Sequence, residues 1–401
     1  MATRTRVRVY EKLGVRPLIN ARSFSTKAGG CALPVEVLDA MCEAGERCVR
    51  MDELQAAASE VIARATGAEA GIVTSGAAAA LTLAAAACLA RLDVTRMNRL
   101  PDTAGMPDQF IVHRAHRNDY DHAVRAAGAT FVEVGFDYFT FAYEVESAIT
   151  AQTAAMYYQA GANQGVLPLD EYATIAHRHG LPVLVDAAAE MPPGSNLKAF
   201  VAAGADLVAF SGGKHIQGPQ STGILCGRRE LILSAALQHQ DMDVFPETWP
   251  LRALIEKGTV TGPPHHGIGR GFKVGKEEIA GLVTALELYQ SRDFAAERAR
   301  WTADMESIAA GVRDMPGVLA RLQYPQPNGR EVPSAIVKID AAVAGIDAHA
   351  VINALQEGDP PICVFEKFAG SGEIVFFPEA LRSGEAAIVA RRLRAVLEDA
   401  G

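Results

Sequence analysis

The residue most suggestive of chemistry is Lys214, which follows Ser211-Gly212-Gly213 at the end of the apolar stretch Asp206–Phe210. The glycines permit an unusual backbone conformation, and a lysine near the end of a buried strand can form an imine with an aldehyde cofactor. The ordinary alternative is a solvated surface charge. A surface lysine, however, would need neither the apolar strand nor the second glycine-containing stretch, Gly218–Gly223. We therefore expect Lys214 to attack a carbonyl group.

A carboxylate stands at the end of another apolar segment, where Asp186 follows Pro182–Val185. The carboxyl ends of parallel strands are where open α/β sheets bind their ligands. If the aldehyde is pyridoxal phosphate, an aspartate paired with the ring nitrogen keeps that nitrogen protonated, so that the ring can accept electrons from the substrate. The alternative is that Asp186 caps the following helix.

A third motif, Thr74-Ser75-Gly76-Ala77, lies between a predicted strand and an alanine-rich helix. Free N–H groups at a helix start, a small hydroxyl and a glycine together form a cradle for a phosphate. The alternative is that Ser75 only caps the helix.

Short apolar segments typical of buried strands recur between residues 54 and 251, with helical stretches such as Leu169–His179 and Asn196–Ala203 between them. This alternation predicts an α/β fold with a mainly parallel central sheet covered by helices on both faces. The predicted strands are Ile72–Thr74, Gln109–His113, Thr130–Val134, Ala154–Tyr158, Pro182–Val185, Asp206–Phe210 and Gly223–Cys226.

The chain is too long for one ordinary core, and we expect three segments. Residues 1–55 form an arm and a helix around Pro34–Arg50, and residues 56–275 form a large domain that ends in the irregular connector Gly262–Gly275. Residues 276–401 contain a long linking helix, Glu277–Arg313, and a small α/β domain. The elements predicted there are strands Ser334–Ile339, Ile362–Phe365 and Glu373–Phe377 and helices Ala348–Glu357 and Gly384–Leu397.

The net charge of −9 argues against nucleic acid as the main partner. Arg4, Arg6 and Arg8 alternate and share one face of an extended arm. We interpret them as exposed, with a tRNA contact as the alternative. Its first residues lack the charged-then-apolar pattern of a signal sequence, and the apolar run Gly76–Ala90 is shorter than the ~20 residues of a membrane span. The 6 cysteines lack a CxxC pair. We expect a cytoplasmic protein with free thiols and no membrane contact.

The three motifs, in this order, resemble those of fold-type I pyridoxal-phosphate enzymes, which have the aspartate aminotransferase-like fold. Over nearly the whole chain the sequence resembles the selenocysteine synthase-like (L-seryl-tRNA(Sec) selenium transferase-like) family, which includes the D-glucosaminate-6-phosphate ammonia lyases. The stretches that carry this resemblance are Leu18–Ala21, Asp52–Gln55, Val73–Ala79, His116–Asp121, Ser211–Lys214, Gly218–Ser221, Gly269-Arg270 and Lys273–Glu278.

The resemblance implies that Lys214 holds pyridoxal 5′-phosphate as a Schiff base and that Asp186 pairs with its ring nitrogen. It also implies that Ser75-Gly76-Ala77 and Ser211 bind the phosphate. Fold-type I sites lie at a subunit interface, so we expect a homodimer or a higher homo-oligomer. Gln220-Ser221-Thr222 would then approach the phosphate of the neighbouring subunit.

Two further pairs of residues are candidates with an open alternative. His116 or Tyr120 could stack on the ring of the cofactor, and core packing is the alternative. Arg270 and Lys273 could bind the carboxylate of the substrate, and exposed connector charge is the alternative.

The sequence departs from the family at Ser23-Phe24-Ser25, where a Gly-Thr-type segment is frequent, and at His215-Ile216-Gln217 after the lysine. The first segment could face the substrate, so the substrate of a relative does not transfer to this chain. We expect no metal site, because His177 and His179 are two apart on a helix and point to different faces. For His265-His266, loop exposure is the simpler interpretation.

The predicted activity is that of a pyridoxal-phosphate-dependent lyase, which eliminates the hydroxyl of a β-hydroxy amino acid to give a 2-oxo acid and ammonia. An epimerase or racemase, an aldolase and a β-replacement transferase use the same start and stay open as alternatives. A non-catalytic regulatory protein is a further alternative, although no DNA-binding module is apparent. Selenium transfer itself is disfavoured, because an acidic chain is poorly suited to holding tRNA.

Overall fold

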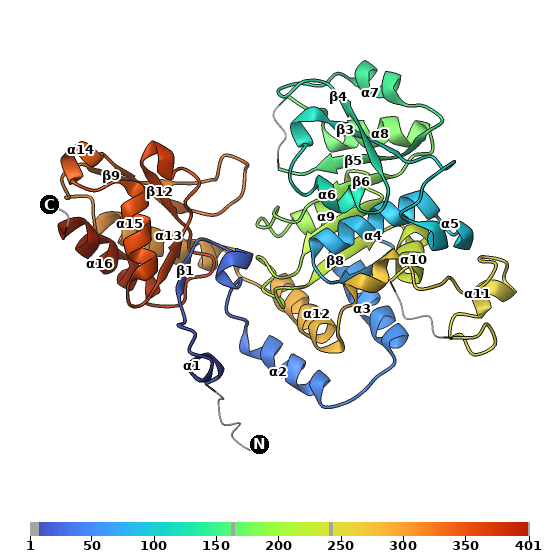
Figure 1. Cartoon of the computed structure of the whole chain (residues 1–401), viewed down its shortest axis with the longest axis horizontal. Coiled ribbons are helices and arrows are strands. Elements are labelled where there is room, and N and C mark those ends of the chain that lie inside the picture. Colours follow the sequence, from blue (N-terminus) through green and yellow to red (C-terminus); the bar gives the residue numbers. More distant parts are fainter. Residues whose placement is uncertain (1–7, 162–164, 240–243, 400–401) are drawn as a thin grey trace. The chain divides into compact units, whose positions relative to one another are not determined.

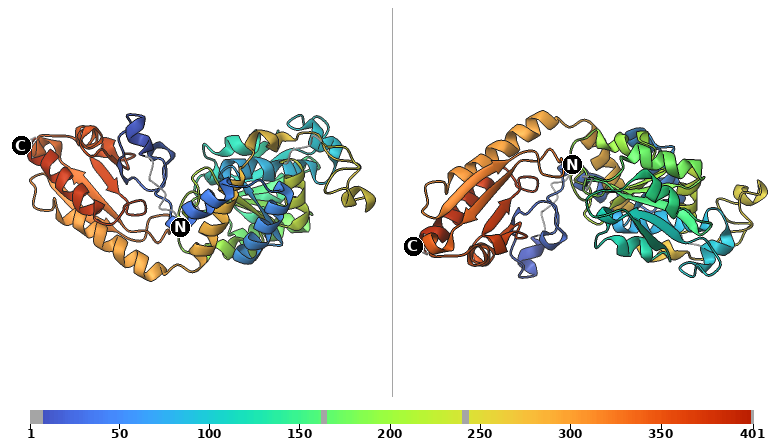
Figure 2. Two further views of the ribbon diagram at one scale, coloured as in Figure 1. Left: turned by 90° about the horizontal axis from the view of Figure 1, so that it is seen from below. Right: turned by 90° about the horizontal axis from the view of Figure 1, so that it is seen from above.

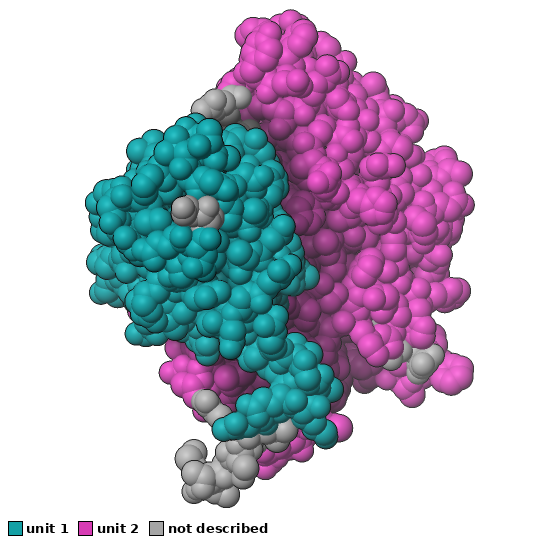
Figure 3. Space-filling model, turned by 60° about the vertical axis from the view of Figure 1, so that its left-hand side comes forward, with its two compact units in different colours: residues 1–32, 293–401 teal, residues 33–292 magenta. Residues whose placement is uncertain are grey.

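The computed structural model describes residues 8–161, 165–239 and 244–399, so Arg4 and Arg6 of the predicted arm lie outside the described residues. The chain divides into two compact units, residues 33–292 and residues 1–32 with 293–401 (Figure 3). These bounds differ from the three predicted segments. Helix α2 (Val35–Gly45) belongs to the larger unit because it packs against α12 (Lys276–Gln290), which belongs there as well.

The larger unit is built around a seven-stranded sheet with the order β2-β8-β7-β6-β5-β3-β4. In this sheet β8 runs opposite to the other six strands, which confirms the mainly parallel sheet predicted from the sequence. The strands are β2 (Ala70–Thr74), β3 (Gln109–His113), β4 (Thr130–Val134), β5 (Thr153–Gln159), β6 (Val183–Asp186), β7 (Leu207–Ser211) and β8 (Gly223–Gly227).

Helices cover both faces of this sheet (Figures 1 and 2). The central one is α4 (Ala77–Ala90), which is almost entirely buried and packs on β5, β7 and β8. Its many alanines have small side chains and allow a close approach to the strands. The other helices of this unit are α3 (Met51–Thr66), α5 (Val94–Arg99), α6 (Asp121–Arg125), α7 (Ala142–Ala148), α8 (Leu169–Arg178), α9 (Asn196–Ala202), α10 (Arg229–Leu237) and α11 (Ala253–Glu256).

The smaller unit has a three-stranded antiparallel sheet, β12-β10-β9, and a parallel pair, β1-β11. The strands β1 and β9 were not predicted from the sequence. The strands are β1 (Ile19–Ala21), β9 (Val318–Gln323), β10 (Ser334–Ile339), β11 (Ile362–Val364) and β12 (Glu373–Phe376). The helices are α1 (Val9–Lys12), α13 (Phe294–Ala310), α14 (Ala341–Ala344), α15 (Ala348–Glu357) and α16 (Glu385–Glu398).

The long linking helix predicted at Glu277–Arg313 is wrong as one element, because α12 ends at Gln290 and α13 starts at Phe294. Asp293 caps α13, and its side chain accepts hydrogen bonds from the N–H groups of Ala295 and Ala296. Such a cap favours a new helix start over continuation of the preceding helix. Within the described ranges, every helix falls short of the length and apolarity that a membrane span requires.

Candidate active site

The strand ends that carry the predicted residues meet at one edge of the large sheet. Parallel strands place their carboxyl ends at a common edge, and the register aligns them closely. Gly223, the first residue of β8, pairs with Thr74 on one side and with Ser211 on the other. On β6, Asp186 pairs with Ala209 of β7 and with Gln159 of β5. The structure thus brings together the three motifs found in the sequence.

Lys214 lies in the tight connection between β7 and β8, where glycines are required. A Cβ atom on Gly213 would lie 2.5 Å from the Cα of Gln220, and one on Gly212 would lie 2.4 Å from the Oγ1 of Thr222. The Gly212 N–H group also donates a hydrogen bond to the Thr222 carbonyl at 2.9 Å. These close contacts hold the two ends of the β7–β8 connection together. The half-buried Lys214 therefore lies just past the end of β7.

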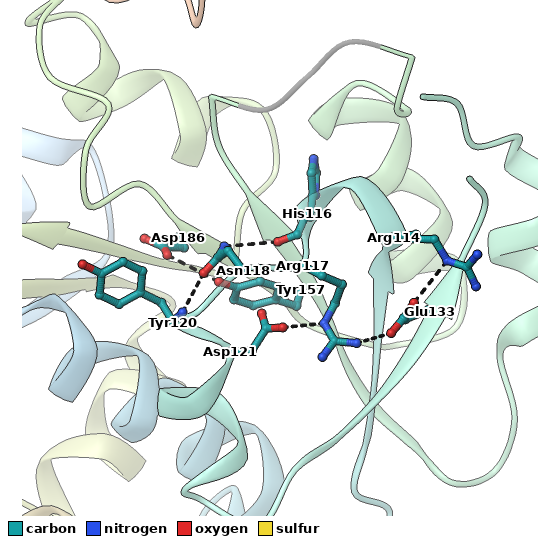
Figure 4. A network of polar contacts seen from close by, with 9 residues as sticks. All are labelled: Arg114, His116, Arg117, Asn118, Tyr120, Asp121, Glu133, Tyr157 and Asp186. Atoms are coloured by element: carbon teal, nitrogen blue, oxygen red, sulfur yellow. Dashed lines mark hydrogen bonds and ion pairs between the residues drawn. The ribbon is translucent and has the colours of Figure 1, made fainter. Parts of the chain in front are cut away.

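Asp186 is a buried carboxylate, with 7% of its surface exposed. Its Oδ1 accepts a hydrogen bond from the Ala188 N–H group at 3.0 Å, and its Oδ2 accepts a longer one from the Tyr157 hydroxyl at 3.4 Å (Figure 4). Burial raises the pKa of Asp186, and the Ala188 N–H group, the nearby Lys214 charge and the Tyr157 hydroxyl lower it again in part. A buried carboxylate with so few donors has an environment suited to a cationic partner.

The contact from Tyr157 was not predicted from the sequence. Tyr157 sits inside the apolar strand β5 and gives no signal of a polar role there. Its burial and the adjacent carboxylate of Asp186 raise the pKa of Tyr157 well above its usual value, so the hydroxyl stays a donor.

The predicted phosphate cradle lies where β2 turns into α4. Gly76 has a φ of 99°, which favours glycine, and a Cβ atom on Gly223 would lie 2.4 Å from the carbonyl carbon of Gly76. The Ser75 hydroxyl makes no cap to α4 and instead donates to the Phe272 carbonyl at 2.7 Å. The first N–H groups of a helix lack helical acceptors. The N-cap residue of α4 is Gly76, which has no side chain that could cap them.

The connector that carries Arg270 and Lys273 is attached to this cradle. It forms the short helix η3 (Ile268–Phe272), whose Phe272 carbonyl accepts hydrogen bonds from both Ser75 and the Nε2 of His239, the latter at 2.9 Å. The helix η3 packs against α4. Arg270 is half-buried and Lys273 is exposed, and Lys273 directly follows Phe272, whose carbonyl binds Ser75.

The three residues expected to approach a neighbouring subunit differ in their exposure to solvent. Gln220 and Ser221 are exposed, whereas Thr222 is buried and its hydroxyl donates to the Pro219 carbonyl at 2.6 Å. Ser211, the last residue of β7, is half-buried.

The two candidates for stacking on the cofactor differ sharply in exposure. His116 has 0% of its surface exposed, and its ring packs against those of His113 and Tyr158 at centroid distances of 4.8 and 4.5 Å. Tyr120 is 62% exposed. His116 thus has the environment expected for the core-packing alternative.

The comparison with known proteins identifies the family. The family model "SelA: L-seryl-tRNA selenium transferase" matches residues 35–243. The chain is 33% identical to a 5′-C-glycyluridine monooxygenase-decarboxylase of Streptomyces sp, over 98% of this chain and 92% of that protein. It is 31% identical to the D-glucosaminate-6-phosphate ammonia lyase of Salmonella typhimurium, over 98% of both chains.

Solved structures agree with this assignment. A structure of D-glucosaminate-6-phosphate ammonia-lyase superposes with a TM-score of 0.81 at 30% identity, covering 99% of this chain and 100% of that one. A serine palmitoyltransferase with bound pyridoxal phosphate–myriocin aldimine shares the fold, with a TM-score of 0.55 at 14% identity over 96% of this chain and 89% of that one. The predicted fold-type I architecture is confirmed, and the chain belongs to the L-seryl-tRNA selenium transferase (SelA) family.

Proposed function

We propose that this protein is a pyridoxal-phosphate-dependent lyase that removes the β-hydroxyl group of an amino acid and yields a 2-oxo acid and ammonia. One observation carries the proposal. A lysine, a buried carboxylate and an uncapped helix start meet at one sheet edge, in a chain 31% identical to an ammonia lyase over 98% of its length.

The residues at this edge fit the three polar parts of the cofactor. The start of α4, with its close glycine contacts, suits a phosphate. Asp186 suits a protonated ring nitrogen, and the half-buried Lys214 suits the aldehyde. When bound, pyridoxal phosphate supplies an electron-accepting ring that makes the Cα proton of an amino acid removable.

The residues of the chain then have distinct tasks. The neutral Lys214 amine takes the Cα proton, and its ammonium form returns that proton to the departing hydroxyl, which leaves as water. Asp186 would face the protonated ring nitrogen and stabilise its positive charge. Arg270 and Lys273, on the connector that is hydrogen-bonded to Ser75, would hold the substrate carboxylate. The released enamine takes up water, which yields the 2-oxo acid and ammonia without an added oxidant.

The exposed Gln220 and Ser221 support the proposal of a homodimer or a higher homo-oligomer in which a neighbouring subunit completes the site. All six cysteines lie in the described part of the chain and none forms a disulfide there. This supports a cytoplasmic protein with a small-molecule amino-acid substrate.

A second candidate activity follows from the monooxygenase-decarboxylase relative, which is 33% identical over 98% of this chain. In that case the chain would remove the carboxyl group of an amino-acid substituent with consumption of dioxygen. The same lysine and aspartate would serve that reaction, so their presence does not distinguish it from the lyase activity.

A product assay separates the two activities. The loaded protein is incubated with D- and L-β-hydroxy amino acids, including phosphorylated sugar acids, and with glycyl nucleosides. A lyase releases ammonia and 2-oxo acid in equal amounts with no oxygen uptake, and Lys214→Ala abolishes the release. Oxygen uptake with carbon dioxide release establishes the second activity instead. Solvent deuterium incorporated at Cα with inversion of its configuration, and with no release of product, would contradict both and identify an epimerase.

A further inference from the structure

The β7–β8 connection, which carries Lys214, packs along α12. A Cβ atom on Gly212 would lie 2.5 Å from the Cδ1 of Leu282, and one on Gly218 would lie 2.9 Å from the same atom. Leu282 is a buried residue of α12. Both ends of the connection therefore rest on one side chain of this helix, and a displacement of α12 would displace the connection with it.

The residue that follows Lys214 is held at the far end of α12. The side chain of His215 is 0% exposed, and its Nδ1 shares a hydrogen bond at 3.2 Å with the hydroxyl of Tyr289, a buried residue in the last turn of α12. The two rings meet edge to face, with their centroids 5.3 Å apart. The His215 carbonyl accepts a hydrogen bond from the Nη1 of Arg292 at 2.9 Å. The ring and the backbone next to Lys214 are thus both fixed.

Gln217 belongs to the same turn and has a backbone conformation that disfavours side chains. Its φ is 61°, in the left-handed region that glycine adopts without strain. Its N–H group donates to the Lys214 carbonyl at 2.8 Å, and its side-chain oxygen accepts from the Nη2 of Arg292 at 3.1 Å. A glycine at this position would relieve the strain but would offer no oxygen to Arg292. The contact with Arg292 therefore accounts for a side chain at this position.

Arg292 joins these contacts from the short segment between α12 and α13. Its guanidinium carbon lies 5.0 Å from the centroid of the Tyr289 ring, while its two terminal nitrogens reach His215 and Gln217. A planar guanidinium can bind two acceptors and an aromatic face at once, which the ammonium group of a lysine cannot do. One side chain thus ties the turn around Lys214 to the end of α12.

We infer that Arg292 and Gln217 are positioning residues for Lys214. Together with His215 and Tyr289 they form a clamp, called the α12 clamp below, that fixes the backbone of the lysine from the side of this helix. The inference rests on the proposed function for the role of Lys214. It gives a task to His215 and Gln217, which lie in the stretch where the sequence departs from its family.

The first test uses the cofactor-free protein and does not depend on the proposed function. Hydrogen exchange is measured by mass spectrometry for the peptide that contains residues 212–218. In Arg292→Ala the N–H groups of Gln217 and Gly218 should exchange about 5- to 10-fold faster, as expected when one hydrogen bond that supports a turn is lost. Arg298→Ala is the matched control, because its guanidinium also lies over a tyrosine ring, at 5.8 Å.

The second test separates the position of the lysine from the rest of the site. The ligands are pyridoxal phosphate and 4′-deoxypyridoxine 5′-phosphate, which has a methyl group in place of the aldehyde and cannot attach to a lysine. Arg292→Ala should weaken the binding of pyridoxal phosphate about 10-fold and that of the deoxy analogue less than about 2-fold. Arg292→Lys should resemble Arg292→Ala, because it cannot bind both acceptors in one plane.

Variants of Gln217 test the strained position directly. Gln217→Gly should weaken the binding of pyridoxal phosphate about 3- to 10-fold without lowering the unfolding temperature, because it removes the contact and the strain together. Gln217→Glu keeps an oxygen for Arg292 and should retain the affinity of the wild type. If Arg292→Ala does not fold, Gln217→Gly carries the test alone.

Two results would overturn the inference. The first is that hydrogen exchange at residues 212–218 is the same in Arg292→Ala as in Arg298→Ala. The second is that pyridoxal phosphate and the deoxy analogue lose affinity equally, which would show a general loosening of the site. A wild type that binds the analogue but does not attach pyridoxal phosphate to Lys214 would refute the proposed function instead, and hydrogen exchange would still decide whether the α12 clamp holds the connection.

Discussion

At the scale of single residues, the burial of Asp186 makes the stability of the folded chain depend on pH. Burial raises its pKa in the folded chain, so the folded state binds this proton more tightly than the unfolded state does. The resulting stability is present below the unfolded pKa and is lost as the pH rises through the folded one. At neutral pH the cofactor-free protein is therefore less stable than it is below the unfolded pKa of Asp186, and a cation supplied by the cofactor would offset this loss.

Asp186→Asn should accordingly have opposite effects on the two forms of the protein. The cofactor-free variant should unfold at a higher temperature than the wild type at pH 7.5, and the difference should shrink toward pH 4. Cofactor affinity should fall about 100-fold or more, since one member of a buried charge pair is lost. Calorimetry across pH checks the first effect and equilibrium dialysis the second. A lower unfolding temperature of the cofactor-free variant at pH 7.5 would contradict the account.

Most residues of the site could be proposed from their types and neighbours. A lysine after Ser-Gly-Gly and an aspartate after an apolar strand are visible in the sequence, and the structure places both at the same sheet edge. Tyr157 could not be found this way. Its role depends on a contact with Asp186 that only the register of the strands creates.

At the scale of elements, the β7–β8 connection determines where the lysine can be. Gly213→Ala would place a methyl group 2.5 Å from the backbone of Gln220, so the hairpin must shift. We expect a loss of about 1–3 kcal/mol in the free energy of unfolding. We also expect a drop in kcat larger than that stability loss explains, because Lys214 moves with the hairpin.

Gly262→Ala is the matched control, because nothing lies within 4 Å of its added methyl group. Denaturant unfolding and steady-state kinetics on both variants check the prediction. Equal kcat values for Gly213→Ala and Gly262→Ala would show that the close contact does not position the lysine.

The strands of the large sheet were the most predictable elements. Their apolar runs are short and lie between turn residues, and all but the edge strand β4 are largely buried. The predicted and observed bounds agree within two residues in each case. The strands β1 and β9 were missed for a physical reason. The first, Ile19–Ala21, is only three residues long and gains its partner β11 from the other end of the chain. The second, Val318–Gln323, lies at the edge of its sheet and is largely unburied.

At the scale of the whole molecule, the two ends of the chain build one unit, and Asn20 holds the first of them in place. This buried side chain donates to the carbonyls of Ser23 and Gly30 at 2.9 and 2.7 Å and accepts from the Arg22 N–H group. Asn20→Ala should cost about 1–3 kcal/mol, because buried backbone groups lose their partners.

Hydrogen exchange should localise this loss. We expect faster exchange in β1 and in its partner β11, with the seven-stranded sheet of the other unit unchanged. Asn328→Ala, at an exposed position of the same unit, serves as the control. Faster exchange across β5 to β7 would contradict the division into two units. That division could not be predicted from composition, because it depends on which helices pack together.

The most direct test of the central claim is the covalent attachment of the cofactor to Lys214. The purified protein is loaded with pyridoxal phosphate, reduced with borohydride, digested and analysed by peptide mass spectrometry. The account predicts a reduced pyridoxyl group on Lys214, no such group in Lys214→Ala, and unchanged labelling in Lys198→Ala, where an exposed lysine is removed. Labelling of a different lysine in the wild type, or no labelling at saturating cofactor, would contradict it.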